Sequence, residues 1–107
     1  MPGNWGLDRT AEGIVVHGDL DFDAAKEFEE QASEAVLRST AGTFLVDLSD
    51  LTFLDSAGLQ ALFRVLELRD DQRVIVQPSR KVFALLYVGG LMDGALPNVV
   101  VREPEPD

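Results

Sequence analysis

The chain has 107 residues, 46% of them hydrophobic, which is the size and composition of one folded domain with its own core. Its 19 acidic residues against 9 basic ones give a net charge of −10, which disfavours nucleic-acid phosphates and anionic lipids as partners. The absence of cysteine excludes a disulfide framework and a thiolate metal site. We find neither a secretion signal nor an apolar run long enough to span a membrane, and therefore expect a soluble cytoplasmic domain.

Strand and helix patterns alternate along the chain. A β-branched run predicts a strand over residues 13–20, closed by a Gly-Asp turn, and residues 21–39 follow it as a predicted helix. The apolar residues of that helix recur at helical spacing: Ala25, Phe28, Ala32, Ala35 and Val36. Residues 43–49 are apolar at nearly every position, which is typical of a strand covered on both faces.

The second half of the chain continues the alternation. The predicted elements are, in order, a helix over residues 57–69, a buried strand over 73–78, a helix from an N-cap at Ser79 to a left-handed stop at Gly89-Gly90, and a last strand over 98–102. Strands separated by single helices predict an α/β domain over residues 1–101, with an open mixed sheet and helices packed on it. The acidic, proline-rich residues 102–107 are predicted to be a disordered tail.

The helix over residues 57–69 is apolar on two sides. One side is expected to cover the sheet: Leu59, Leu62, Phe63 and Leu66. These residues join Phe44, Val46, Leu48, Val74, Val76, Val82 and Phe83 in the predicted core. The other side is expected to face solvent: Ala57, Ala61, Val65 and Leu68. Such a second apolar face indicates either a partner surface or burial beneath the N-terminal segment 4–7.

The join between the strand and this helix carries the candidate functional residues. Asp55 and Ser56 lie just beyond the carboxyl end of a strand, where parallel sheets tend to place functional groups. Ser56 is in position to cap the helix through its hydroxyl. Gly58 in the first turn costs roughly 0.5–1 kcal/mol relative to Ala, which indicates that the backbone must stay open there.

Three segments resemble one known family. The sequence VDLSDLTFLDSAGLQAL, residues 46–62, resembles the signature of STAS domains and specifically of anti-sigma factor antagonists. GDLDFDAAKEF, residues 18–28, is similar to the Gly-x-Leu-Asp turn and first helix of that family. PSRKVFALLYVGGL, residues 78–91, resembles its segment from the fourth strand to a helix that ends in Gly-Leu.

The resemblance implies a phosphorylation switch. It implies that Ser56 is phosphorylated by a partner anti-sigma factor with serine kinase activity, and that a PP2C-type phosphatase reverses the modification. The unphosphorylated domain would bind the anti-sigma factor and free a sigma factor for transcription. Together with the outer helix face, this gives the expected partner-binding residues Asp19, Asp21, Asp55, Ser56, Ala57, Gly58, Ala61, Val65 and Leu68, with Asp47 ordering the adjoining loop.

Other functions fit the sequence less well. A STAS subunit of a cytoplasmic transport complex, for example one that moves lipids, would dock the same turn on an ATPase subunit. An enzyme is disfavoured because no nucleophile–base pair or metal cluster is readable, and His17 is the only histidine. We therefore expect a protein-binding module without cofactor or metal, monomeric or weakly homodimeric.

Overall fold

The computed structural model describes residues 4–91 and 95–104, and the last residues of the predicted tail lie outside this range. The elements are β1 (Trp5–Arg9), β2 (Gly13–Leu20), α1 (Phe22–Arg38), β3 (Thr43–Leu54), α2 (Ser56–Leu66), β4 (Arg73–Pro78), α3 (Arg80–Val88) and β5 (Val99–Val101). The strands form one sheet in the order β1-β2-β3-β4-β5, in which only β1 runs antiparallel to its neighbour. The predicted α/β domain with a mixed sheet is confirmed.

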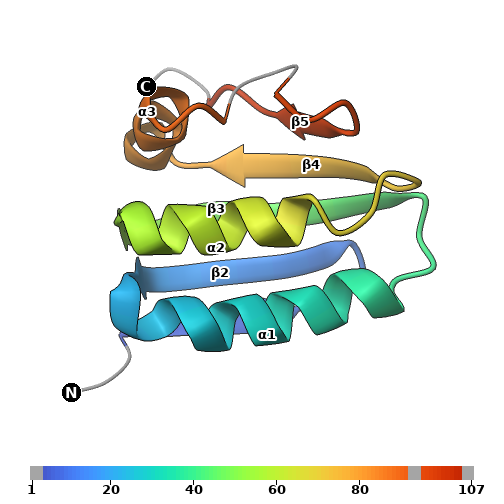
Figure 1. Cartoon of the computed structure of the whole chain (residues 1–107), viewed down its shortest axis with the longest axis horizontal. Helices are drawn as coiled ribbons and strands as arrows, with labels where there is room; N and C mark the ends of the chain where they lie inside the picture. The colour runs from blue at the N-terminus through green and yellow to red at the C-terminus, as the bar shows by residue number, and fades with distance from the viewer. Residues whose placement is uncertain (1–3, 92–94, 105–107) are drawn as a thin grey trace.

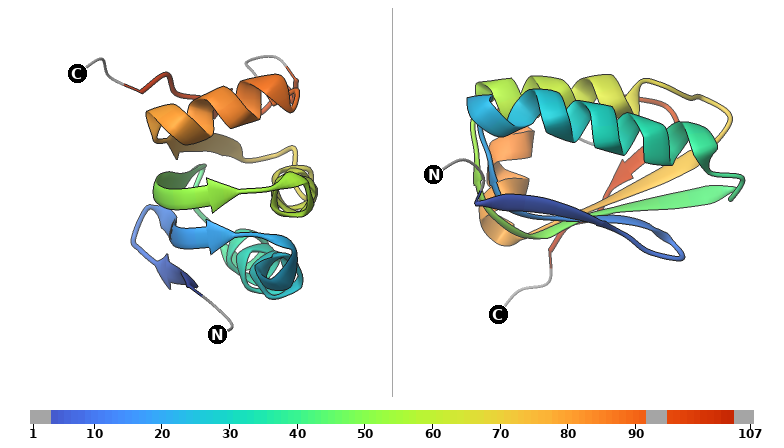
Figure 2. Two further views of the ribbon diagram at one scale, coloured as in Figure 1. Left: turned by 90° about the vertical axis from the view of Figure 1, so that its left-hand side faces the viewer. Right: turned by 90° about the horizontal axis from the view of Figure 1, so that it is seen from below.

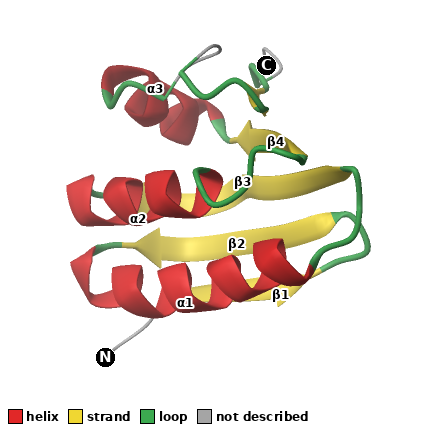
Figure 3. Cartoon of the chain, turned by 45° about the vertical axis from the view of Figure 1, so that its right-hand side comes forward, coloured by secondary structure: helices red, strands yellow, loops and turns green. Residues whose placement is uncertain are grey.

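Helices and strands form two layers. α1 and α2 lie side by side on one face of the sheet (Figures 1 and 3). α3 crosses the end of the sheet beyond the carboxyl end of β4 (Figure 1). Among the described residues no helix covers the opposite face of the sheet (Figure 2, right).

Burial along the central strands follows this one-sided arrangement. In β3, Phe44, Val46 and Leu48 are buried, whereas Leu45 and Asp47 between them are partly exposed. β4 alternates in the same way. The predictions that residues 43–49 are covered on both faces and that residues 73–78 form a buried strand are therefore wrong for one face of the sheet. Apolar residues also occupy the face that carries no helix, and for this reason the sequence pattern suggested two covered faces.

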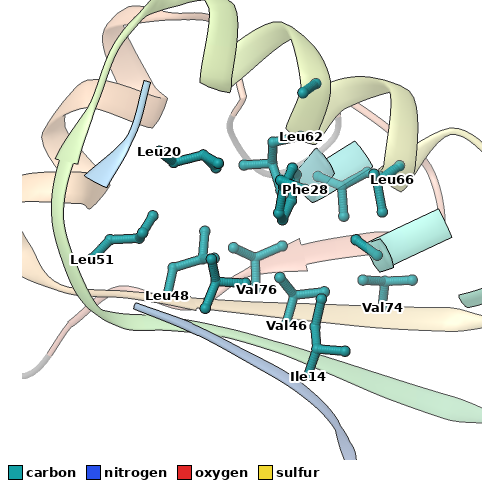
Figure 4. Close-up of a cluster of buried hydrophobic side chains, with 14 of the residues drawn as sticks. Ile14, Leu20, Phe28, Val46, Leu48, Leu51, Leu62, Leu66, Val74 and Val76 are labelled. Atoms are coloured by element: carbon teal, nitrogen blue, oxygen red, sulfur yellow. The ribbon is translucent and has the colours of Figure 1, made fainter. Parts of the chain in front are cut away.

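The core lies between the sheet and the two helices. Phe28 from α1 and Leu62 and Leu66 from α2 point toward Val46 and Val76 on the strands (Figure 4). Eight residues predicted for the core are buried, namely Phe44, Val46, Leu48, Leu62, Leu66, Val74, Val76 and Val82, while Leu59, Phe63 and Phe83 pack at its edge.

The rotation of α2 differs from the prediction. Ala61 and Val65 are 0% and 1% exposed, so the expectation that they face solvent is wrong. With 3.6 residues per turn, both lie next to Leu62 on the helix surface rather than opposite it. The two predicted faces are two halves of one broad apolar arc, which covers the sheet and also meets α1 beside it (Figure 2).

The N-terminal segment and β3 also depart from the prediction. The segment that includes Trp5 forms β1 and pairs with β2, so it does not cover α2. The ring of Trp5 packs edge-on against Phe28, with 6.4 Å between the ring centroids. β3 continues past Ser49 to Leu54, because two register shifts against β2 interrupt its alternation without ending the strand.

The ends of α3 agree with the prediction. The Ser79 hydroxyl accepts a hydrogen bond from Val82 N at 3.2 Å. Gly90 has a φ of +94°, the left-handed conformation that ends helices and favours glycine.

Candidate functional site

Three helices start at one end of the sheet. The carboxyl ends of β2, β3 and β4 lead directly into α1, α2 and α3, whose N-termini lie at this same end of the sheet (Figure 1). The first turn of a helix presents unpaired N–H groups and a partial positive charge, which attract carboxylates and phosphates. The arrangement explains why acidic side chains are concentrated at this end.

Asp55 joins the first two helix starts. Its Oδ1 accepts a hydrogen bond from Gly58 N at 2.9 Å and so caps α2. Its Oδ2 accepts from Phe22 N, the first residue of α1, at 3.0 Å. The prediction that Ser56 caps α2 is therefore wrong: Asp55 has this role and also ties α2 to α1.

Ser56 is the first residue of α2 and is exposed. Within the part of the chain that the structure describes, no hydrogen bond of its side chain is found. Its hydroxyl is thus a small polar group on the surface. It lies next to the Asp55 carboxylate, at the positive end of the helix dipole of α2. An enzyme that modifies hydroxyls can reach it without unfolding the domain.

Gly58 is buried and holds α2 against β2. A Cβ atom at this position would lie 2.1 Å from the carbonyl oxygen of Leu20, the last residue of β2. The open backbone that the sequence indicated is thus needed for packing inside the chain. Buried Gly58 is not itself available for direct contact with a partner, whereas its neighbours Ser56 and Ala57 are accessible.

Asp19 and Asp21 are also engaged within the domain. Asp19 Oδ1 accepts a hydrogen bond from Thr52 Oγ1 at 2.7 Å, and Lys81 Nζ donates to the Thr52 carbonyl at 3.2 Å. Thr52 is the extra residue at one register shift of β3, so these contacts hold the irregular end of the strand. Asp21 caps α1 by accepting from Ala24 N at 3.1 Å.

Asp47 lies farther back along β3. Its Oδ1 accepts from Ser49 N at 2.9 Å and from Ser49 Oγ at 2.6 Å. Both bonds stabilise the first register shift, opposite Val16. Asp47 acts on β3 itself and makes no direct contact with the Asp55–Ser56 turn.

Two exposed phenylalanines flank the turn, and the sequence analysis missed both. Phe22 is 77% exposed, and its backbone N–H donates a hydrogen bond to Asp55. Phe53, two residues before Asp55 in the chain, is 46% exposed. Spacing gave no signal for Phe22, because it precedes Ala25 by three residues and so continues the apolar period of its helix.

A groove of about 660 Å³ opens beside the turn, between the first halves of α1 and α2. Phe22, Ala25 and Ala57 provide its apolar part. Arg64 Nη1 bonds Glu29 Oε1 across the two helices at 3.1 Å. The groove joins the exposed apolar side chain of Phe22 to the residue that follows Ser56.

Three expected contact residues do not join this surface. Ala61 and Val65 are in the core, and Leu68 is exposed but follows the far end of α2. An α-helix rises about 1.5 Å per residue, so Leu66, the last residue of α2, is roughly 15 Å from Ser56 along the axis, and Leu68 follows it. The accessible group is therefore Ser56, Ala57, Phe22 and Phe53.

Two further searches bear on the class of site. Among the described residues no group of three or more His, Cys, Asp or Glu side chains is placed to hold a metal ion. No helix in the described ranges is long and apolar enough to cross a membrane.

Comparison with known proteins identifies the family. The family model described as "Mlab, STAS domain" matches residues 5–101. The chain is 31% identical over 91 residues to the anti-sigma F factor antagonist of Lysinibacillus sphaericus, and the match covers 78% of each chain. The chain therefore belongs to the STAS domain family, in its group of anti-sigma factor antagonists.

Solved structures agree in fold. An anti-sigma factor antagonist from Mycobacterium paratuberculosis is 25% identical with a TM-score of 0.67, over 91% of this chain and 84% of that one. The anti-sigma factor antagonist SpoIIAA in its unphosphorylated form is 24% identical with a TM-score of 0.60, over 92% and 88% of the two chains. The Bacillus cell fate determinant SpoIIAA in the phosphorylated form is 21% identical with a TM-score of 0.57, over 92% and 91%.

Proposed function

We propose that this chain is an anti-sigma factor antagonist of the cytoplasm, switched by phosphorylation of Ser56. With Ser56 unmodified it binds an anti-sigma factor that is also a serine kinase, and a sigma factor is released. Phosphorylation by that kinase ends the binding, and a PP2C-type phosphatase restores it. The chain itself acts by binding and not by catalysis. The observation that carries the proposal is an exposed Ser56 hydroxyl at a helix start whose capping is done by Asp55.

The charge at the turn supports the direction of the switch. A phosphate adds about −1.5 to −2 charges and three acceptor oxygens. The N–H groups of the first turn of α2 tolerate this charge within the free chain. A partner packed on the turn would have to desolvate the phosphate beside the Asp55 carboxylate, which strongly disfavours the complex.

The accessible residues define the docking surface that we propose. Phe22, Phe53 and Ala57 supply apolar contact around Ser56, and exposed aromatic side chains are frequent energetic anchors of interfaces. Asp19, Asp21 and Asp55 support this surface from behind through their bonds to Thr52 and to the helix starts. Ala61 and Val65 are excluded from it by burial.

Phosphorylation and binding are tested together. The chain is incubated with ATP and each serine-kinase anti-sigma factor of the same genome, the label is located by mass spectrometry, and both forms are titrated against the kinase. We expect phosphate on Ser56 and at least about a hundredfold weaker binding of the modified form, as for loss of a central contact. Ser56→Ala should bind without being modified. Label on Thr52 or Ser49, or equal affinities for the two forms, would contradict the switch.

A pair of variants tests the docking surface separately. Phe22→Glu should weaken binding of the unmodified chain, whereas Val88→Glu, on an 85% exposed residue of α3, should not. Both should retain the unfolding free energy of the parent within about 0.5 kcal/mol, as exposed substitutions usually do. If no serine kinase binds and the chain instead co-purifies with an ATPase subunit of a transporter, the transport function replaces this proposal.

A further inference from the structure

The face of the sheet opposite α1 and α2 has a regular composition. The strand register aligns Asp8, Val15, Asp47 and Gln77 in one row across four strands. The neighbouring row contains Gly13, Leu45, Ile75 and Val100. In the described parts of the chain no helix lies over these rows (Figure 2). We call this surface the open face.

The centre of the open face is apolar. Leu45 and Ile75 are a register pair on the two middle strands, and both are only partly buried. Together with Ala11, Glu12, Thr43 and Arg102 they line a hollow of about 340 Å³, in which Glu12 and Arg102 are the charged residues. Val15 and Val100 lie on either side of this pair and are also partly buried. Water therefore meets a continuous aliphatic strip across four strands.

Charge divides the open face into two halves. On the strands, one half carries Asp8 from β1 and two acids from β3, namely Asp47 and Asp50, the register partner of His17. The other half carries Arg73 of β4 and, just after β5, Arg102, whose Nη1 donates to Gln77 Oε1 at 3.1 Å. An acidic half beside a basic half is a self-complementary pattern.

We propose that the open face binds a second copy of this chain. A two-fold axis parallel to the strands, between β3 and β4, turns the acidic half of one copy onto the basic half of the other. It also sets Leu45 of each copy against Ile75 of its mate, at the spacing of about 10 Å typical of stacked sheets. An axis perpendicular to the strands would place acid on acid, so charge selects the first arrangement.

The size of the open face sets the strength of the dimer. Five strands about 4.8 Å apart, with about six residues each at about 3.3 Å, give roughly 400–500 Å² per copy. The total is below the roughly 1,200 Å² at which stable interfaces begin, so the dimer is weak and depends on concentration. The helix starts and Ser56 lie at a different edge, so a dimer leaves the docking surface accessible.

Sedimentation equilibrium of the full chain tests the proposal, from about 10 μM to about 1 mM, where weak interfaces associate. The mean mass should rise with concentration from one chain toward two. Ile75→Lys should raise the dissociation constant roughly tenfold or more, since it puts charge at the apolar centre. Val88→Lys, an exposed apolar residue on α3, is the matched control and should not change it.

Two further variants keep the test decisive. Arg102→Glu alters an exposed side chain, keeps the fold, and should also weaken the dimer by making both halves acidic. Deletion of residues 103–107 should leave the dimer unchanged. A single-chain mass at every concentration, equal effects of Ile75→Lys and Val88→Lys, or no effect of Arg102→Glu would each overturn the proposal. Dimerisation that appears only after the deletion would assign the open face to the tail instead.

Discussion

The two ends of the sheet are stabilised by side chains of opposite character. One end carries the helix starts and the proposed docking surface, and we call it the docking end. Here carboxylates accept hydrogen bonds from helix starts, as Asp21 and Asp55 do for α1 and α2. At the other end, the Arg69 guanidinium donates to the carbonyls of Val36 and Ser39 at 2.9 and 2.7 Å, where α1 ends. Acidic side chains thus lie at the positive ends of helix dipoles, and a basic side chain lies at a negative end.

The ends differ in what is left unused. At the Arg69 end, buried Gln72 donates to Ser39 Oγ and the Ala41 carbonyl, and Asn98 donates to the carbonyls of Arg69 and Gln72. The donor groups of these side chains hold loops together, and Gln72 Oε1, which has no hydrogen-bond partner within the described ranges, is buried and so closed to a partner protein. At the docking end Ser56 is exposed while its neighbour performs the capping. Ser56 is therefore a polar group that the fold does not require, and this property supports the regulation proposed for it.

Ala61→Arg should have the largest effect, because α2 connects the two ends and Ala61 is fully buried. An unpaired charge in the core costs about 3–5 kcal/mol. We expect the free energy of unfolding, measured by urea titration, to fall by this amount or the chain to remain unfolded. Leu68→Glu at the exposed end of the same helix should change it by less than about 0.5 kcal/mol. Equal effects of the two substitutions would contradict the observed rotation of α2.

The error in the rotation of α2 has a physical cause. Hydrophobic spacing correctly predicted that the helix is apolar over most of its circumference. Spacing alone does not say which neighbour covers which part, because α1 and the sheet bury the same kinds of side chain. The position of α1 beside α2 is set by the tertiary structure, and because α1 packs there, Ala61 and Val65 are buried.

Local chemistry was predictable where one residue decides it. Ser79 and Gly90 were identified as the boundary signals of α3 because a hydroxyl N-cap and a left-handed glycine act within one turn. Asp55 and Ser56 are both good N-cap residues, and residue type did not show that Asp55 takes the cap through Gly58 N and also bonds Phe22 N, 33 residues earlier in the chain. β1 escaped prediction because its glycine and charged residues lack a strand pattern and its order comes from pairing with β2.

Asp55→Ala should have the next largest effect, since it removes the shared acceptor of two helix starts. Loss of the cap and of the bond to Phe22 N should lower the free energy of unfolding by about 1–3 kcal/mol. Asp55→Asn is the control, because an amide oxygen still caps a helix and only one acceptor is lost. Hydrogen exchange should show faster opening of both α1 and α2 in Asp55→Ala. Faster exchange in α2 alone would mean that Asp55 does not couple the helices.

Two serine substitutions sharpen the contrast between a structural and an unused hydroxyl. Ser79→Ala removes the cap of α3 and should cost about 0.5–2 kcal/mol. Ser56→Ala removes an exposed hydroxyl that does not cap α2 and should cost less than about 0.5 kcal/mol. Thermal and urea unfolding of both variants measure the difference. A loss at Ser56 as large as that at Ser79 would mean that the hydroxyl of Ser56 also stabilises α2.

The smallest effect is expected in acid, at the Arg69 end. The hydrogen bond from Arg69 is the main cause that lowers the pKa of Asp71 below its ordinary value of 3.8. The folded state therefore binds a proton at Asp71 less readily than the unfolded state does. The resulting stabilisation is present above pH 3.8 and is lost as the pH falls through the lower pKa of the folded state.

The Asp71 contribution is measured as a slope of stability against pH. The exposed carboxylate of Asp71 lies 2.9 Å from Arg69 Nε, and solvent screens this contact, so the change in slope should be small. Asp71→Asn and Arg69→Gln should reduce the acid slope of the unfolding free energy below about pH 4 by the same amount. Arg69→Gln should in addition lower stability at every pH, because the carbonyls of Val36 and Ser39 lose their donor. A slope that changes in one variant and not in the other would separate the carboxylate from the guanidinium and contradict their pairing.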